Sequence, residues 1–202
     1  MDEPISPQEM SRVLARAYRL VGELWCSPQD VQAGGLKDQA QEVVADLASQ
    51  NPEVASCLSR FLAHYPPPEE RYVELFELNP LCPLYLGSHV FEEPKTCAQA
   101  AVSDRNEYML ELIGVYKHFG LALKGRELPD YLPLMVEALA LTAQTQDPLR
   151  AKFIEEYILP FLPALRSKLQ ALQTPYIHLL DGLEGLLRWE REAQMRQVAS
   201  CG

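Results

Sequence analysis

The side chains best suited to nucleophilic or metal chemistry are few and scattered along this 202-residue chain. The sequence has five cysteines and four histidines, and no two cysteines are spaced as C-x-x-C. A zinc or iron–sulfur site needs closely spaced thiolates or imidazoles. We therefore predict free, reduced thiols in a reducing compartment, with neither a bound metal nor a cofactor.

One Cys/His pair could supply a nucleophile and its base, because Cys82 and His89 lie in the same short stretch. The sequence offers no third group to orient them and no oxyanion hole. Adjacent carboxylates such as Glu155-Glu156 point about 100° apart on a helix, which is typical of solvated surface. Glycine-rich phosphate loops, zinc-protease motifs and nucleophile elbows do not occur. The sequence predicts that the protein is not an enzyme, with the Cys82–His89 pair as the alternative.

The excess of acidic over basic residues indicates which classes of binding partner suit the chain. The chain has 18 Lys+Arg and 28 Asp+Glu, which gives a formal net charge of −10. Nucleic acids and anionic membranes attract clustered cations, so both are disfavoured as partners, whereas a basic partner would suit this chain. The start of the sequence, MDEPISPQEM, is acidic and polar, and no apolar run reaches membrane-spanning length. We expect no signal peptide, no stable membrane insertion and a cytoplasmic location.

The hydrophobic pattern predicts an all-α protein, a single-domain helical bundle of about eight helices over residues 1–202. Apolar residues recur at three- and four-residue spacing, and Gly and β-forming residues are few. Four helix starts combine a capping residue with proline, namely Ser6-Pro7, Asn51-Pro52, Asp147-Pro148 and Thr174-Pro175. A long helix is expected over 98–118 before Gly120, and a break or kink at Pro160 and Pro163.

The stretch from Leu78 to Phe91 is unusual because it is broken by two prolines and a glycine and yet is rich in large apolar side chains. Loops are normally polar because they lie in water. A long apolar loop either packs onto the core or forms a binding surface. The sequence leaves both interpretations open.

Two blocks flanking this loop resemble a known family. The first is YVELF from Tyr72 to Phe76, followed after the loop by HVFEE from His89 to Glu93. The second is ELPDYLPL, residues 127–134, with Glu137 downstream. Together they resemble the TorD/DmsD/NarJ family of redox-enzyme maturation chaperones, and most of all its NarJ-type branch, which is nitrate reductase delta subunit-like. Pro94 stands where the family pattern has serine, and Tyr131 where it commonly has histidine.

The resemblance implies an all-helical cytoplasmic chaperone for the catalytic subunit of a molybdenum enzyme. Such chaperones assist insertion of the molybdenum cofactor and prevent early membrane docking or export. Many of them recognise the N-terminal segment of the client. The two departures point to a branch that serves a related enzyme, such as one acting on selenate, chlorate, dimethyl sulfide or ethylbenzene. A helical adaptor that binds a folded partner is the alternative, and both a monomer and a homodimer are left open.

The candidate client-binding residues lie in and around the two blocks. They are Tyr72, Phe76, Leu84, Tyr85, His89, Phe91, Glu93, Asp130 and Tyr131. A basic, partly apolar client segment would be attracted to an acidic chaperone with an apolar groove. For Tyr72, Phe76 and Leu84 the alternative is a place in the core, for Asp130 it is the N-cap of the next helix, and for Glu93 it is a solvated loop.

Overall fold

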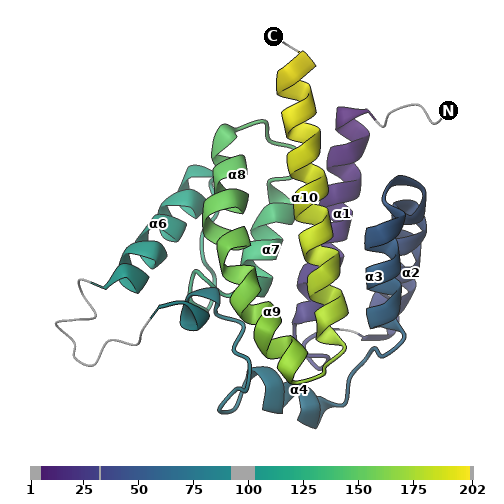
Figure 1. Cartoon of the computed structure of the whole chain (residues 1–202), viewed down its shortest axis with the longest axis vertical. Coiled ribbons are helices and arrows are strands. Elements are labelled where there is room, and N and C mark those ends of the chain that lie inside the picture. The colour runs from purple at the N-terminus through teal and green to yellow at the C-terminus, as the bar shows by residue number, and fades with distance from the viewer. Residues whose placement is uncertain (1–5, 32, 92–102, 201–202) are drawn as a thin grey trace.

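The computed structural model describes residues 6–31, 33–91 and 103–200, and these residues are arranged as a bundle of α-helices (Figure 1). The α-helices are α1 (Pro7–Trp25), α2 (Ala33–Gln50), α3 (Pro52–Leu62), α4 (Glu69–Phe76), α6 (Asp104–His118), α7 (Leu132–Leu141), α8 (Pro148–Lys152), α9 (Leu162–Ala171) and α10 (Tyr176–Ser200). A short 3-10 helix, η1 (Leu86–His89), ends the apolar stretch. The described ranges contain no strand, so the predicted all-α class is confirmed.

The predicted capping residues begin three of the helices. The Oγ of Ser6 accepts from the backbone N–H of Glu9 at 3.2 Å, and the side chain of Asn51 accepts from Val54 at 3.1 Å. Asp147 caps α8 in the same way, through the N–H of Leu149 at 2.8 Å. A capping side chain followed by proline satisfies an orphan N–H and fixes the backbone for the first turn. Local sequence alone therefore sets these helix starts.

The long helix expected after Asp147 bends where the prolines require it. α8 continues into a π-helix, η2 (Phe153–Ile158), then a 3-10 turn, η3 (Leu159–Phe161), and then α9. Pro160 has no N–H to donate and its ring crowds the preceding turn, so regular α-helical bonding cannot continue through it. Pro163 lies in the first turn of α9, where proline is tolerated. When α8 to α9 is taken as one kinked helix, the described residues contain eight helices.

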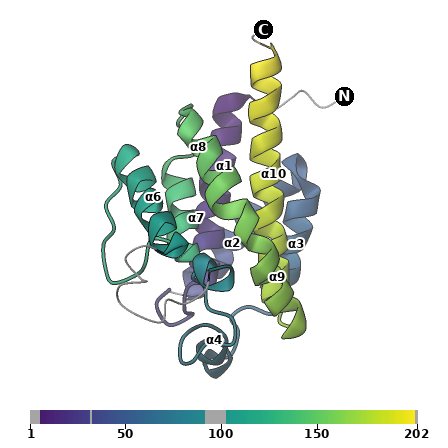
Figure 2. The same cartoon turned by 60° about the vertical axis from the view of Figure 1, so that its left-hand side comes forward.

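The core lies around α1, which packs on α7, α10 and α2, while α3 packs on α2 and α10. Figures 1 and 2 show α1 and α10 in the middle of the bundle, α2 and α3 beside them, and α6 as an outer helix. The buried apolar residues of the described ranges form one continuous cluster. Among the described residues, no helix has both the length and the apolar character needed to span a bilayer.

A buried ion pair joins four of these helices. The side chains of Arg150 in α8 and Glu190 in α10 are 1% and 5% exposed, and Arg150 Nε donates to Glu190 Oε1 at 2.6 Å. Tyr18 of α1 donates its hydroxyl to Glu190 Oε2 at 2.9 Å. Arg150 also donates to the carbonyl of Leu139 at 2.9 Å and to the hydroxyl of Thr142, both near the end of α7. Each charge is therefore matched by an opposite charge or a polar group, as burial requires.

Candidate functional site

Two of the predicted site residues, Tyr72 and Phe76, lie in the interior. They are 1% and 6% exposed and belong to an aromatic cluster with Trp25 and Tyr176. The Tyr72 hydroxyl donates to the carbonyl of Trp25 at 2.9 Å, which connects α4 to the end of α1. Burial of this kind stabilises the attachment of α4, but it leaves neither side chain available on the surface of this conformation.

Leu84 and Asp130 belong to a backbone clamp between the apolar stretch and the start of α7. The N–H of Leu132 donates to the carbonyl of Leu84 at 2.8 Å, and the N–H of Leu86 donates to the carbonyl of Asp130 at 3.0 Å. These two bonds make an isolated antiparallel bridge between Tyr85 and Tyr131. We call residues 84–87 with 130–132 the clamp. It brings the apolar stretch into direct contact with the second sequence block, ELPDYLPL.

The side chain of Asp130 stabilises the clamp through a hydrogen bond to the backbone of Gly87. The expectation that Asp130 caps α7 is wrong. Helix α7 begins at Leu132 after Tyr131, and no side chain caps it. Asp130 is instead fully buried and accepts the N–H of Gly87 at 2.9 Å. Burial raises the pKa of Asp130, against the opposing effects of the Gly87 hydrogen bond and the charge of Arg105. The carboxylate is used in a tertiary contact rather than in a local cap.

Gly87 is required at this place because Asp130 approaches so closely. A Cβ atom at position 87 would lie 2.8 Å from Asp130 Oδ2 and 3.3 Å from the ring of Phe91. Any larger residue would therefore force the clamp apart.

Tyr85 and Tyr131 form the half-buried face of the clamp. Their ring centroids are 5.4 Å apart, and the Tyr85 hydroxyl donates to Glu127 Oε2 at 2.6 Å. Burial, with Glu127 as the second cause, raises the pKa of Tyr85 to about 12. Burial also raises the pKa of Tyr131. Both hydroxyls stay protonated at neutral pH, so this face offers apolar rings and neutral hydroxyl groups.

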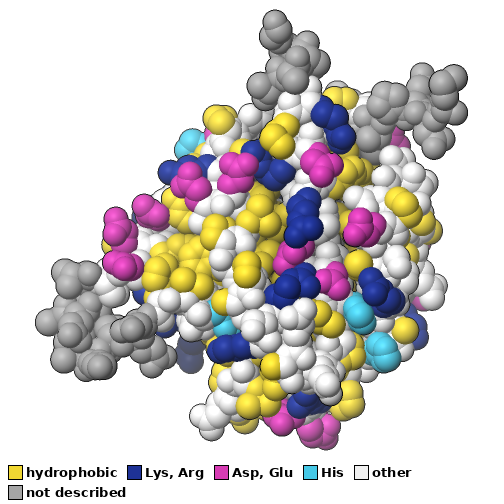
Figure 3. Space-filling view, in the orientation of Figure 1, with side chains coloured by type: hydrophobic (Ala, Val, Ile, Leu, Met, Phe, Trp, Pro, Cys, Tyr) yellow, Lys and Arg dark blue, Asp and Glu magenta, His cyan; other side chains and the backbone are white. Residues whose placement is uncertain are grey.

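His89 and Phe91 lie at the C-terminal end of the apolar stretch. His89 Nε2 lies 2.7 Å from the carbonyl of Pro83, and burial lowers the pKa of its imidazole. Phe91 packs on Tyr108 and Phe161 at centroid distances of 5.5 and 5.7 Å. Figure 3 shows hydrophobic side chains gathered on the surface of the molecule where α6 meets the segment from α8 to α9. Phe91 is thus half-buried between α6 and η3, and the predicted Glu93 and Pro94 lie outside the described residues.

The Cys82–His89 alternative receives no support from the environment of the thiol. Cys82 is fully buried, and burial raises the pKa of the Cys82 thiol to about 11. A nucleophilic cysteine needs a lowered pKa and access to its substrate. Three cysteines in the described ranges, Cys26, Cys57 and Cys82, are free thiols, and those ranges hold no cluster of side chains that could bind a metal.

The sequence-based choice of residues missed two exposed leucines at the start of the apolar stretch. Leu78 is 75% exposed and Leu81 is 46% exposed, whereas Cys82 and Leu84 beside them are buried. Asn79 adopts a positive φ of 48°, a conformation that asparagine tolerates better than most residues. We call residues 69–81 the α4 turn. The Asn-Pro pair at 79–80 is a turn signal that could have indicated which leucines face outward.

Carboxylates accompany these leucines on the α4 turn. Glu70, Glu74 and the C-cap residue Glu77 are exposed and follow i, i+4, i+7 spacing along one side of α4, and Glu74 pairs with Arg71 at 2.6 Å. Within residues 69–77 there are four glutamates and one arginine, so 1 − 4 gives a local charge of −3. In Figure 3 carboxylates lie close to hydrophobic side chains at the lower end of the molecule, where Figure 1 shows α4. The turn combines exposed apolar surface with negative charge.

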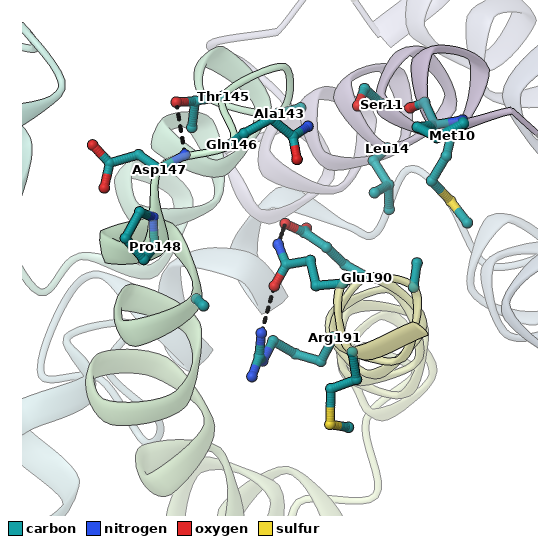
Figure 4. Close-up of a pocket in the computed structure, with 15 residues that line it drawn as sticks. Met10, Ser11, Leu14, Ala143, Thr145, Gln146, Asp147, Pro148, Glu190 and Arg191 are labelled. Atoms are coloured by element: carbon teal, nitrogen blue, oxygen red, sulfur yellow. Dashed lines mark hydrogen bonds between the residues drawn. The ribbon is translucent and has the colours of Figure 1, made fainter. Parts of the chain in front are cut away.

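A separate hollow of about 570 Å³ lies at the other end of the bundle (Figure 4). α1 lines it with Met10 and Leu14, the connection before α8 contributes Gln146, and α10 contributes Glu190 and Arg191. Its walls are mainly apolar, and the Glu190 carboxylate is already paired with an arginine. The other charged side chains among the described residues that line the hollow are also paired, Asp147 with His118 and Arg191 with Glu155.

A comparison with protein families identifies the chain. The family model described as nitrate reductase delta subunit matches residues 67–181, which is more than half of the sequence. The chain belongs to the nitrate reductase delta subunit family. The delta subunit match includes the α4 turn and the whole clamp, whereas α1 and most of α10, which line the hollow, lie outside it.

Two curated proteins illustrate the relationship within the delta subunit family. The chain is 34% identical over 113 residues to the nitrate reductase molybdenum cofactor assembly chaperone NarJ of Escherichia coli (strain K12), covering 56% of this chain and 43% of that protein. It is 32% identical over 115 residues to the probable nitrate reductase molybdenum cofactor assembly chaperone NarW of the same strain, covering 57% and 45%. The chain spans less than half the length of these curated relatives.

Proposed function

We propose that this protein is a cytoplasmic chaperone for the catalytic subunit of a molybdenum oxidoreductase of the dimethyl sulfoxide reductase type. It would hold that subunit during insertion of the molybdenum cofactor, before membrane docking or export. The observation that carries the proposal is the delta subunit match over residues 67–181. The matched relatives are named as molybdenum cofactor assembly chaperones, and the match includes the clamp and the α4 turn. The chaperone itself would perform no catalysis.

The client contact would be the N-terminal segment of that subunit, bound at the α4 turn and the half-buried face of the clamp. The exposed Leu78 and Leu81 offer apolar contact, and the adjacent glutamates favour a basic segment. Of the residues selected from the sequence, Tyr85, His89, Phe91 and Tyr131 retain some exposed surface.

The other four described candidates would act by positioning this surface. Tyr72, Phe76 and Leu84 lie beneath it, and Asp130 fixes Gly87. Because these four are buried, substituting them would reduce stability as well as binding, so they are unsuitable for a first test.

The binding surface is tested by calorimetric titration of the client's N-terminal peptide against matched variants. Leu78→Ala combined with Leu81→Ala should weaken binding about tenfold or more, because two exposed apolar contacts are lost. Leu141→Ala is the control, since Leu141 is 56% exposed at the end of α7, away from this surface. Raising the salt concentration should also weaken binding. Equal affinity for the wild type and the double variant at both salt concentrations would contradict the site.

The maturation role is tested by producing the client with and without this protein. A chaperone predicts that the client made alone lacks its cofactor and is inactive. A helical adaptor that binds a folded partner predicts full client activity without it, and that outcome would reject the proposal.

A further inference from the structure

A basic strip stands out in this acidic chain. Between Glu111 and Glu127 the sequence has no carboxylate and contains Lys117, Lys124 and Arg126. All three side chains are exposed, and none forms an ion pair with a described residue. The other titratable side chains in this interval are Tyr116, which is buried, and His118, which is paired with Asp147 at 2.6 Å. We call residues 117–128 the basic strip, and the one carboxylate within it, Glu127, accepts from the Tyr85 hydroxyl.

The basic strip also exposes apolar surface. Leu123 and Leu128 are 38% and 44% exposed. Leu110, which is 60% exposed, shares the outer face of α6 with Lys117 through i, i+7 spacing. Positive φ angles at Gly120 and Gly125 let the chain leave the helix, and in Figure 2 it runs back alongside α6. Exposed leucines therefore occur together with cations that form no ion pair with the described residues.

The α4 turn has the opposite charge and a similar apolar content. It presents three glutamates along one side of α4 beside the exposed Leu78 and Leu81. The α4 turn is at one end of the bundle and the outer face of α6 is at its side (Figures 1 and 2). One molecule can thus offer its basic strip while its own α4 turn stays accessible.

We propose that the basic strip of one molecule docks on the α4 turn of a second copy of this chain. The opposite charges of the basic strip and the α4 turn attract the two molecules to each other, and the exposed leucines of both surfaces supply contact area. Because the two surfaces differ, copies joined by a single contact of this kind are arranged head-to-tail, and further copies can add at either end.

A second copy fits the strip better than a nucleic acid or a membrane does. Three cations on a chain of net charge −10 supply too little attraction for polyanions, which bind through many phosphate contacts. The opposing surface on the same protein needs no such excess of positive charge.

Self-association of this kind would regulate the client site, and this consequence rests on the proposed function. The α4 turn covered by a second copy is the surface proposed for the client's basic segment. The client and the second copy then compete for the α4 turn. At high concentration and without client, part of the chaperone is therefore held in the self-associated form.

Charge reversal tests the contact by sedimentation velocity on the full chain over a wide concentration range. The strip variant carries Lys117→Glu, Lys124→Glu and Arg126→Glu, and the turn variant carries Glu70→Lys, Glu74→Lys and Glu77→Lys. The wild type should associate at about 0.1 M salt and dissociate at about 1 M, where the screening length falls from about 10 to about 3 Å. Each variant alone should have a dissociation constant at least about tenfold higher.

An equimolar mixture of the two variants should associate again, because the reversed strip then meets the reversed turn. Circular dichroism confirms that each variant is folded. A wild type that stays monomeric at low salt, or a mixture that fails to associate, overturns the proposal. Binding of the wild type to phosphatidylserine vesicles with loss in the strip variant would assign the strip to membranes instead.

Titration with the client peptide separates this proposal from the proposed function. The strip variant keeps its α4 turn, so it should bind the client peptide at least as tightly as the wild type. Loss of self-association with unchanged peptide binding supports both proposals. Self-association of the wild type without peptide binding would reject the proposed function alone.

Discussion

The buried ion pair between Arg150 and Glu190 gives the most direct stability prediction. Glu190 accepts from Arg150 Nε at 2.6 Å, from Arg150 Nη2 at 3.0 Å, and from the Tyr18 hydroxyl at 2.9 Å. Glu190→Gln keeps the shape of the side chain but replaces one carboxylate oxygen by an NH₂ group, which faces the hydrogen-bond donors of Arg150 and Tyr18. The Arg150 cation then lies in the interior without a compensating charge. Loss of one partner of a buried pair costs about 3–5 kcal/mol.

Thermal and urea unfolding followed by circular dichroism measure this cost. In a domain of this size, 1 kcal/mol corresponds to roughly 2–4 °C, so the Tm should fall by about 6–20 °C. Glu192→Gln is the matched control, because Glu192 is exposed two residues further along α10, and its Tm should hardly change.

A double variant separates the ion pair from simple packing. Arg150→Met with Glu190→Leu removes both charges and should recover much of the stability lost in Glu190→Gln, because no charge stays buried alone. A loss below about 1 kcal/mol in Glu190→Gln would refute the reasoning, and so would a double variant less stable than the single one.

Three further predictions concern the clamp and its surroundings. Gly87→Ala should destabilise the protein by about 1–3 kcal/mol through the contact with Asp130, whereas Gly114→Ala, with open space around it, should not. Burial raises the pKa of Asp130, so the folded protein releases this proton at a higher pH than the unfolded chain does. The free energy of unfolding of the wild type should therefore fall, relative to that of Asp130→Asn, as pH rises above the ordinary aspartate range. A difference in unfolding free energy that does not change with pH would contradict this. Iodoacetamide at neutral pH should leave Cys82 unmodified in the folded protein; rapid labelling, detected by peptide mass mapping, would disprove its burial as a neutral thiol.

Local features of the fold could be predicted from the sequence because they depend on neighbouring residues. The caps at Ser6 and Asn51 and the bend before Pro163 need only a few adjacent residues. The start of α6 differs from the expected helix over 98–118, because Ser103 has an extended backbone and caps a helix that begins at Asp104, while residues 98–102 lie outside the described residues.

The arrangement of the site depends on contacts that local patterns do not contain. The apolar stretch that contains Tyr85 and the block that contains Tyr131 were both identified, but nothing local indicates that their backbones pair. Asp130 precedes a helix, as a capping residue does, yet it bonds to Gly87, which lies 43 positions away. Likewise, large apolar side chains in one stretch are divided between core and surface by the backbone path, so Leu84 is buried while Leu78 is exposed.

The central position of α1 has a consequence for how the protein is made. The Tyr18 hydroxyl and the Glu190 carboxylate that it contacts are separated by 172 positions in the sequence. The ribosome releases α1 well before α10, so the apolar face of α1 has no α10 to cover it until α10 has been synthesised. Contacts of such long sequence separation slow folding and prolong the time during which hydrophobic surface is exposed. The core around α1 can therefore be completed only after α10 has left the ribosome, and until then the apolar face of α1 stays uncovered by α10.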